Sequence, residues 1–166
     1  YMKVRFFCAV LISMSCIACS TIEYAQVNNS LKGKKVGVYA FDLTLSKKHS
    51  KKEMDTVCFC NGQAASEAMS PFLLTAGMNV TNLYSYQKVS IEKALQRADS
   101  LQLDYILIGN GIIEMQGKSS FMQSLNVKLI NVQSKESHMV TSFSGVAIRP
   151  AKAGMKIGKK IQSKLK

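Results

Sequence analysis

Residues 104–115 read DYILIGNGIIEM, and this stretch decides the fold. Its first part, Tyr105 to Ile108, is apolar at four consecutive positions, which is typical of a strand buried on both faces. Gly109 and Gly111 then predict a bulge or a bend within one long strand. Residues 36–41, with the sequence VGVYAF, form a second run of the same kind. Two such strands predict a sheet that is covered by helices.

Helix signals lie on either side of these strands. Residues 63–76 have apolar positions at helical spacing, and Pro71 inside them predicts a kink or a split, with Ser70 capping the second piece and Gly77 ending it. Ser90 is placed to cap a helix over residues 91–101. A last helix is expected from Pro150 to Leu165. The charged residues 46–55 are expected to form a loop.

The remaining segments predict strands at 78–83, 125–131 and 139–148, the last two joined by a hairpin turn at 134–137. The predicted fold class is therefore α/β. We expect a mixed sheet of about five strands with helices packed on it, and its second half should be an antiparallel meander.

The start of the chain has the pattern of an export signal. Lys3 and Arg5 precede an apolar run, and small residues lead to Cys19. The pattern resembles a bacterial lipoprotein signal, in which the cysteine is lipidated and becomes the first residue after cleavage. An ordinary cleaved signal and a membrane anchor are the alternatives, although a spanning helix needs roughly 20 apolar residues. The expected organisation is a signal peptide at 1–18, a lipidated cysteine and short tether at 19–33, and a single periplasmic domain at 34–166.

The chain is strongly basic, with a formal net charge of +12. Loss of Lys3 and Arg5 with the signal would leave +10. Such a charge suits contact with polyanions or anionic lipid surfaces, or it serves solubility alone. Nucleic acid is not an expected partner, because an exported protein rarely meets it.

Three motifs in order resemble a family of bacterial envelope lipoproteins. They are a first strand of Val-x-Val-x-x-Phe type at 36–41, a helix that closes on glycine before a short strand at 73–80, and the segment LDYILIG at 103–109. The family includes the curli secretion channel subunit, the outer-membrane activators of penicillin-binding proteins and the N-terminal domain of the Tol translocation protein. The resemblance covers residues 34–165.

The resemblance implies a non-catalytic scaffold or accessory role in envelope or secretion-system assembly. It implies an acyl (palmitate-type) anchor at Cys19, a protein partner in the envelope and a homo-oligomer as a further option. In many Gram-negative lipoproteins an aspartate after the lipidated cysteine retains the protein in the inner membrane. Ser20 stands there, so the resemblance favours the periplasmic face of the outer membrane.

No catalytic or cofactor motif is present. The sequence has neither a Gly-x-Ser-x-Gly elbow nor a His-Glu-x-x-His motif, so we expect neither an enzyme nor a cofactor. Cys58 and Cys60, with His49 and His138, are poorly spaced for a zinc site, and no metal is expected. The two cysteines could form a disulfide or remain as reduced thiols in a surface loop.

The last helix is the best binding candidate in the sequence. Gly154, Ile157, Ile161 and Leu165 share one face of it, while the opposite side is basic. The candidate anion-binding residues are Lys152, Lys156, Lys159, Lys160 and Lys164. They could meet anionic lipid or another polyanion, which is the alternative function. They could equally form the solvated side of a helix packed on the sheet.

Overall fold

The chain forms a seven-stranded mixed sheet in a computed structural model that describes residues 22–23, 31–46 and 51–164. The strand order is β1-β7-β6-β5-β2-β4, with β3 pairing β5 beside this path. The strand bounds are β1 Ile22–Glu23, β2 Lys35–Val38, β3 Asp42–Leu45, β4 Asn79–Asn82, β5 Tyr105–Gln116, β6 Ser119–Asn131 and β7 Ser137–Ile148. The predicted mixed α/β fold is confirmed, with more strands than the five expected.

Strand β5 divides the sheet into a parallel and an antiparallel half. On one side it runs parallel to β2 and, further along, to β3. On the other side β5, β6 and β7 form the predicted antiparallel meander. A register shift between Ile112 and Ile113 is the bulge of this long strand, next to the glycines that predicted it.

The run at 36–41 was predicted as one strand, and this is wrong in detail. Only residues 36–38 of it lie in a strand, β2, and residues 39–41 connect β2 to β3, which begins at Asp42. The backbone N–H of Tyr39 still donates to Leu107 O of β5, at 3.1 Å. The N–H of Phe41 instead donates to Gly62 O in a helix, at 3.3 Å, and so leaves the sheet. The helix that approaches this strand therefore interrupts it.

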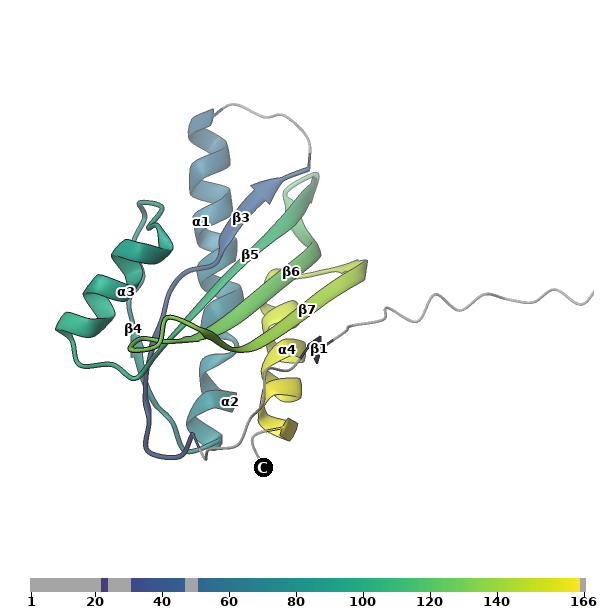
Figure 1. The fold of residues 1–166 in the computed structure, drawn as a ribbon. Helices are drawn as coiled ribbons and strands as arrows, with labels where there is room; N and C mark the ends of the chain where they lie inside the picture. The colour runs from purple at the N-terminus through teal and green to yellow at the C-terminus, as the bar shows by residue number, and fades with distance from the viewer. Residues whose placement is uncertain (1–21, 24–30, 47–50, 165–166) are drawn as a thin grey trace, which may run out of the picture.

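The helices are α1 Lys51–Glu67, α2 Ser70–Thr75, α3 Ile91–Ser100 and α4 Pro150–Lys164. Helices α1, α2 and α4 pack together on one face of the sheet, while α3 stands apart from them (Figure 1). Two hydrophobic clusters follow from this arrangement. The larger joins Ala65, Leu73 and Ile157 of the three helices to strand residues such as Leu107. The smaller packs Ala94 and Ala98 of α3 against the other face, at Ile106 and Ile130.

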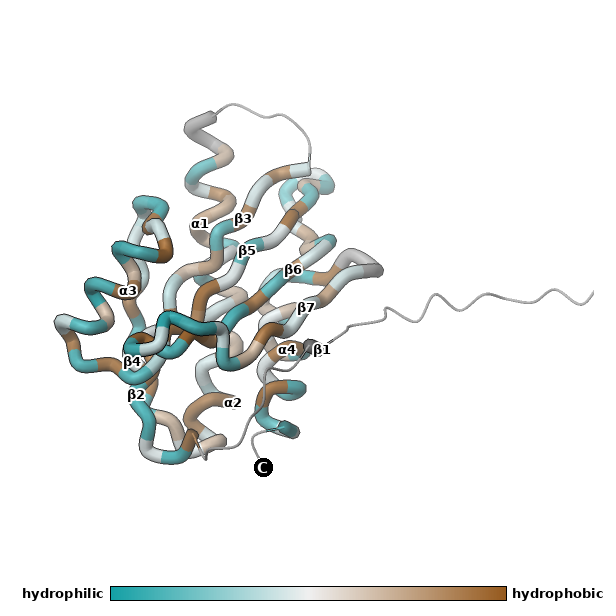
Figure 2. Tube along the Cα trace, in the orientation of Figure 1, coloured by the Kyte–Doolittle hydropathy of each residue, from teal (hydrophilic) through white to brown (hydrophobic). Residues whose placement is uncertain are grey.

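The hydropathy of the helices agrees with these layers. Along α3 and α4, hydrophilic and hydrophobic residues alternate at short intervals (Figure 2). This is expected of helices with one face on a sheet and one in solvent. In α4 the predicted apolar residues Gly154, Ile157 and Ile161 are buried, whereas Leu165 lies outside the described residues.

Helix α1 is the largest difference from the sequence-based expectation. It begins at Lys51, inside the expected charged loop, and so includes Cys58 and Cys60. Its sequence lacks a strong apolar stripe, because it packs through small residues such as Gly62 and Ala65. The predicted break near Pro71 is confirmed, since α1 ends before it and α2 begins at Ser70.

Most of the predicted helix ends are confirmed. Gly77 follows α2 with φ of +86°, and the Ser90 hydroxyl accepts a hydrogen bond from the backbone N–H of Lys93. The proposed Ser70 cap is wrong, since Met69 holds the cap position and makes no side-chain bond there. Leu31 is buried in the larger cluster, so the packed part of the chain includes residues before the expected boundary at 34.

Two isoleucines on the same face of β5 provide a direct test of this arrangement. Ile106 is fully buried under α3, whereas Ile112 lies beyond the helix and is 41% exposed. Ile106→Ala should lower the free energy of unfolding by about 2–5 kcal/mol through the cavity it leaves. Ile112→Ala is the matched control and should cost about 0.5 kcal/mol or less. Urea denaturation measures both, and equal losses would contradict the placement of α3.

Candidate functional site

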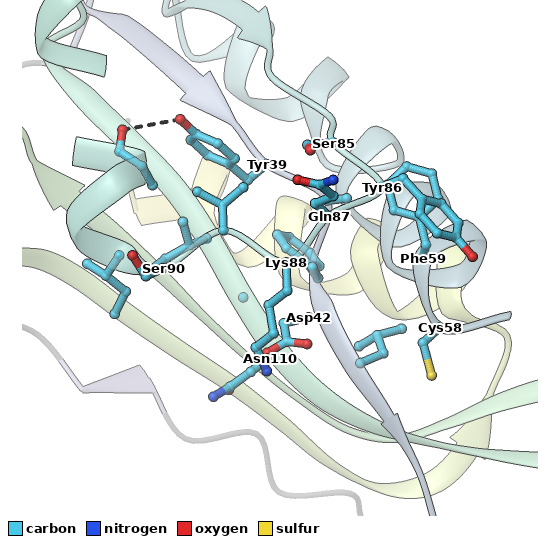
Figure 3. Close-up of a pocket in the computed structure, with 18 of the residues that line it drawn as sticks. Tyr39, Asp42, Cys58, Phe59, Ser85, Tyr86, Gln87, Lys88, Ser90 and Asn110 are labelled. Atoms are coloured by element: carbon cyan, nitrogen blue, oxygen red, sulfur yellow. Dashed lines mark hydrogen bonds and ion pairs between the residues drawn. The ribbon is translucent and has the colours of Figure 1, made fainter. Parts of the chain in front are cut away.

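A pocket of about 630 Å³ opens on the side of the sheet that faces α3. Its floor is the start of β3 with the middle of β5 and β6. One wall is the N-terminal end of α3 with the segment 85–90 that leads to it. The opposite wall comes from α1, and Tyr86 at the other end of the segment 85–90 packs against it (Figure 3). This volume lies in the usual range of small-molecule sites, and none of the predicted site residues except Cys58 lines it.

A row of polar side chains crosses the floor. Asp42 of β3 is directly opposite Asn110 of β5, and Asn110 is directly opposite Asn126 of β6. Side chains opposite one another on neighbouring strands project to the same face, about 4.5–5.5 Å apart. The Asn126 Oδ1 is buried and has no hydrogen-bond partner within the described part of the chain. The sheet thus presents one carboxylate and two carboxamides side by side.

Two lysines belong to the same site. Lys88 reaches from the segment 85–90 and forms an ion pair with Asp42 (Figure 3). Lys128 lies on β6, two residues after Asn126 on the same face, and is half-buried. Among the described residues no side chain pairs with Lys128. Lys88 is paired with a carboxylate, and Lys128 adds a positive charge at the floor.

The α3 wall is held to the sheet by Tyr39. The Tyr39 hydroxyl donates to the Ala94 carbonyl oxygen at 3.1 Å, and both residues line the pocket. Burial raises the pKa of Tyr39, which the charge of Arg97 partly offsets. The phenol therefore stays protonated at neutral pH and keeps donating. This bond fixes the N-terminal end of α3, with Ser90 and Ile91, at the pocket mouth.

The α1 wall is aromatic. The rings of Phe59 and Tyr86 are 5.2 Å apart at an angle of 59°, a favourable tilted arrangement. The Tyr86 hydroxyl lies 2.9 Å from the Thr56 hydroxyl of α1. Tyr86 is nevertheless 56% exposed, so one side of its ring is open at the rim. An apolar or aromatic group of a ligand can pack against these rings.

Cys58 contributes a thiol to this wall, but its environment suppresses reactivity. Burial raises its pKa, the nearby carboxylates of Asp55 and Asp42 raise it further, and a backbone hydrogen bond from Leu45 opposes the shift. A nucleophilic cysteine needs the opposite, since the thiolate is the reactive form. His138 does not line the pocket and packs on Tyr105, a residue of the larger core cluster, with ring centroids 5.3 Å apart. The arrangement is suited to binding.

The other predicted site residues are scattered. Cys19 and His49 lie outside the described residues. Cys58 and Cys60 are on a helix and not in a loop, and both thiols are free. Residues two apart on a helix project about 200° from each other, so the suggested disulfide has no suitable geometry. The described residues contain no group of three potential metal ligands.

The lysines of α4 are largely exposed to solvent, as the sequence predicts. Lys152, Lys156, Lys159 and Lys164 are exposed and Lys160 is half-buried. Lys156 lies over the Phe143 ring at 5.8 Å. No helix in the described ranges is long and apolar enough to span a membrane.

The sequence held only weak signals for the pocket. Asn110 and Asn126 interrupt otherwise apolar or alternating strands, which is visible in the sequence. Their register, however, depends on how β5 and β6 pair. The contribution of α1 was hidden, because that segment was expected to be a loop.

Comparisons with known proteins identify the fold. No protein-family model and no curated protein sequence matches the chain. PelC of Paraburkholderia phytofirmans, solved as a dodecamer, has TM-scores of 0.53 and 0.52 in two crystal forms, with 14% and 16% identity. The alignments cover 90% and 89% of this chain and 99% and 97% of PelC. The chain therefore shares the overall fold of PelC.

Two other solved structures are less similar. A homologue of a neuraminyllactose-binding hemagglutinin from Helicobacter pylori has a TM-score of 0.47 and 11% identity, covering 86% of this chain and 90% of its own. The C-terminal domain of LpoB from Salmonella enterica has a TM-score of 0.37 and 16% identity, covering 71% and 84%.

Proposed function

We propose that this chain is an exported, lipid-anchored protein of the bacterial envelope that works as a non-catalytic part of a protein assembly. The observation that carries the proposal is the fold shared with PelC, a protein solved as a dodecamer. The signal-like residues 2–19 support the location, with Cys19 as the lipidated residue and the periplasmic face of the outer membrane as the expected site. The assembly partners are further copies of the chain, another envelope protein, or both.

The chemistry of the pocket supports a binding role over catalysis. Its one thiol has a raised pKa, and within the described residues neither a histidine nor a group of metal ligands lies beside it. A hydrolase would need a nucleophile within hydrogen-bond reach of a base. The polar row of the floor supplies hydrogen-bonding groups without that pair.

The lysine face of α4 favours a second candidate, which is binding of anionic lipid or another polyanion. Lys152 and Lys159 are exposed on this helix and have no partner among the described residues. Cations grouped on one exposed helix face can add their attractions to an anionic surface, about 1 kcal/mol for each near a membrane.

Lipid anchoring depends on one sulfur atom. Full-length protein with Cys19→Ser, expressed in a Gram-negative bacterium, should leave the membrane fraction or remain unprocessed, because no thiol would be available for acylation. Cys16→Ser is the matched control and should leave anchoring intact. Fractionation with intact-mass measurement gives the readout. Mature Cys19→Ser protein that is still membrane-bound would refute the anchor.

The assembly role is tested on the wild type. Detergent-extracted wild-type protein that is strictly monomeric and has no partner protein bound would refute this role.

Charge reversal separates the two candidates. Lys152→Glu with Lys159→Glu should elute from a heparin column at clearly lower salt if α4 is the polyanion surface, because salt screens such contacts. Lys93→Glu with Lys118→Glu changes the net charge equally at exposed positions elsewhere. Both pairs should leave folding nearly unchanged, within about 0.5 kcal/mol for each substitution. An equal decrease in the eluting salt concentration for both pairs would mean that only the total charge matters. The lysines of α4 would then be an ordinary solvent-exposed helix face.

A further inference from the structure

Three polar side chains on the pocket floor have no partner among the described residues: Asn110, Asn126 and Lys128. The Asn126 Oδ1 has lost contact with solvent without gaining a hydrogen bond. Leaving a buried polar atom unpaired costs about 1–3 kcal/mol, so most native structures avoid it. Lys128 is half-buried, and within the described ranges neither an ion pair nor a hydrogen bond holds it. The pocket therefore contains unsatisfied hydrogen-bonding capacity at one place.

The three groups converge on one patch of the sheet. Asn110 is directly opposite Asn126, and Lys128 follows Asn126 by two residues on the same face of β6. Successive side chains on one face of a strand are about 7 Å apart, within reach of a common ligand. The unpaired Asn126 Oδ1 is an acceptor, and turning the carboxamide over puts its NH₂ group in that place as a donor. The Asn110 carboxamide can donate in the same way, and an ammonium group has three donors and no acceptor. A set of this kind, rich in donors and carrying one positive charge, suits an anionic group.

The carboxylate beside this patch forms an exposed ion pair. Asp42 is next to Asn110 in the row, and Lys88 pairs with it. Without Lys88, Asp42 would repel an anion bound at the two asparagines. The other carboxylate of the lining, Asp55, comes from α1 and belongs to the wall that carries Cys58 and Phe59. The N-terminal end of α3, at Ser90 and Ile91, adds a weak positive potential on the α3 side.

The remainder of the pocket is suited to an apolar body. Phe59 and Tyr86 form one wall, and Ile91, which is 50% exposed, lies at the mouth. Exposed aromatic and aliphatic groups around a concave polar floor are typical of small-molecule sites. The volume of about 630 Å³ is too large for an inorganic ion alone.

We propose that this pocket binds a small organic anion, whose carboxylate or phosphate group contacts Lys128, Asn110 and Asn126 and whose apolar body packs against Phe59 and Tyr86. Lys88 keeps Asp42 from repelling this anion. The net charge of +12 adds a favourable long-range field for anionic ligands. This proposal concerns the pocket alone and does not depend on lipid anchoring or on assembly.

The first test uses defined probes on detergent-purified full-length protein, with binding measured by isothermal titration calorimetry. Phenyl phosphate and phenylacetate should bind, and the better of the two identifies the anionic group. Phenylacetamide, which keeps the ring without the charge, and inorganic phosphate, which keeps the charge without the ring, should each bind at least tenfold more weakly. Equal binding of the neutral amide, or no binding of either organic anion up to about 10 mM (about −3 kcal/mol), would overturn the proposal.

The second test locates the site. Lys128→Gln should weaken binding of the preferred anion at least tenfold, while Lys118→Gln, at an exposed residue of the β5–β6 turn, should leave it unchanged. A thermal melt confirms that each variant is folded. Unchanged affinity in folded Lys128→Gln would place the anion elsewhere and reject the pocket.

A third test isolates the neutralising pair. Lys88→Gln should weaken anion binding severalfold, because Asp42 is then an unpaired carboxylate beside Asn110. Adding Asp42→Asn to that variant should restore most of the affinity, since it removes the repulsion without restoring the lysine. A double variant as weak as Lys88→Gln would mean that Lys88 contacts the ligand itself and that the proposed role of Asp42 is wrong.

Discussion

The close approach of helix α1 to its neighbours is the constraint on which the rest of the structure depends. A Cβ atom on Gly62 would overlap the carbonyl oxygen of Phe41. About one turn further along α1, a Cβ atom on Gly154 of α4 would overlap the carbonyl oxygen of Ala65. Each added Cβ atom would meet a backbone carbonyl group. Rotation of a side chain therefore cannot remove the overlap that a larger residue would cause. Two glycines thus allow α1 to pack closely against both the start of β3 and α4.

This packing of α1 explains both the interrupted strand and the pocket. Because Gly62 lies against Phe41, the N–H of Phe41 bonds to the helix, and the strand predicted at 36–41 ends at Val38. The chain then re-enters the sheet as β3, which brings Asp42 into line with Asn110 and Asn126. The same helix carries Phe59 to the far wall. On the opposite side of the sheet α3 covers only the region around Ile106, which leaves the polar row accessible.

The parts that the sequence could predict are those set by local patterns. The apolar run at 105–108 predicted a central strand, Ser90 and Gly77 marked helix ends, and the alternation at 125–131 predicted the meander. The part of α1 before residue 63 was missed because contacts such as that of Gly62 are made by small residues, whose role becomes visible only when a neighbour is placed against them. The pocket was missed because a row across three strands requires their register, which separate segments of sequence do not contain. Anchoring at Cys19 remains a prediction from the sequence.

The stability of Gly62→Ala tests the role of α1 most directly, because helix propensity and packing predict opposite signs. Alanine is favoured over glycine in a helix interior by about 1 kcal/mol, so without the close contact the variant should be more stable. The packing of α1 against Phe41 predicts instead a loss of about 1–3 kcal/mol, since the added methyl group overlaps a fixed carbonyl. Cys60→Ala, at an exposed position of the same helix, should change stability little and serves as the control. A Gly62→Ala protein that unfolds at higher urea than the wild type would contradict the proposed packing of α1.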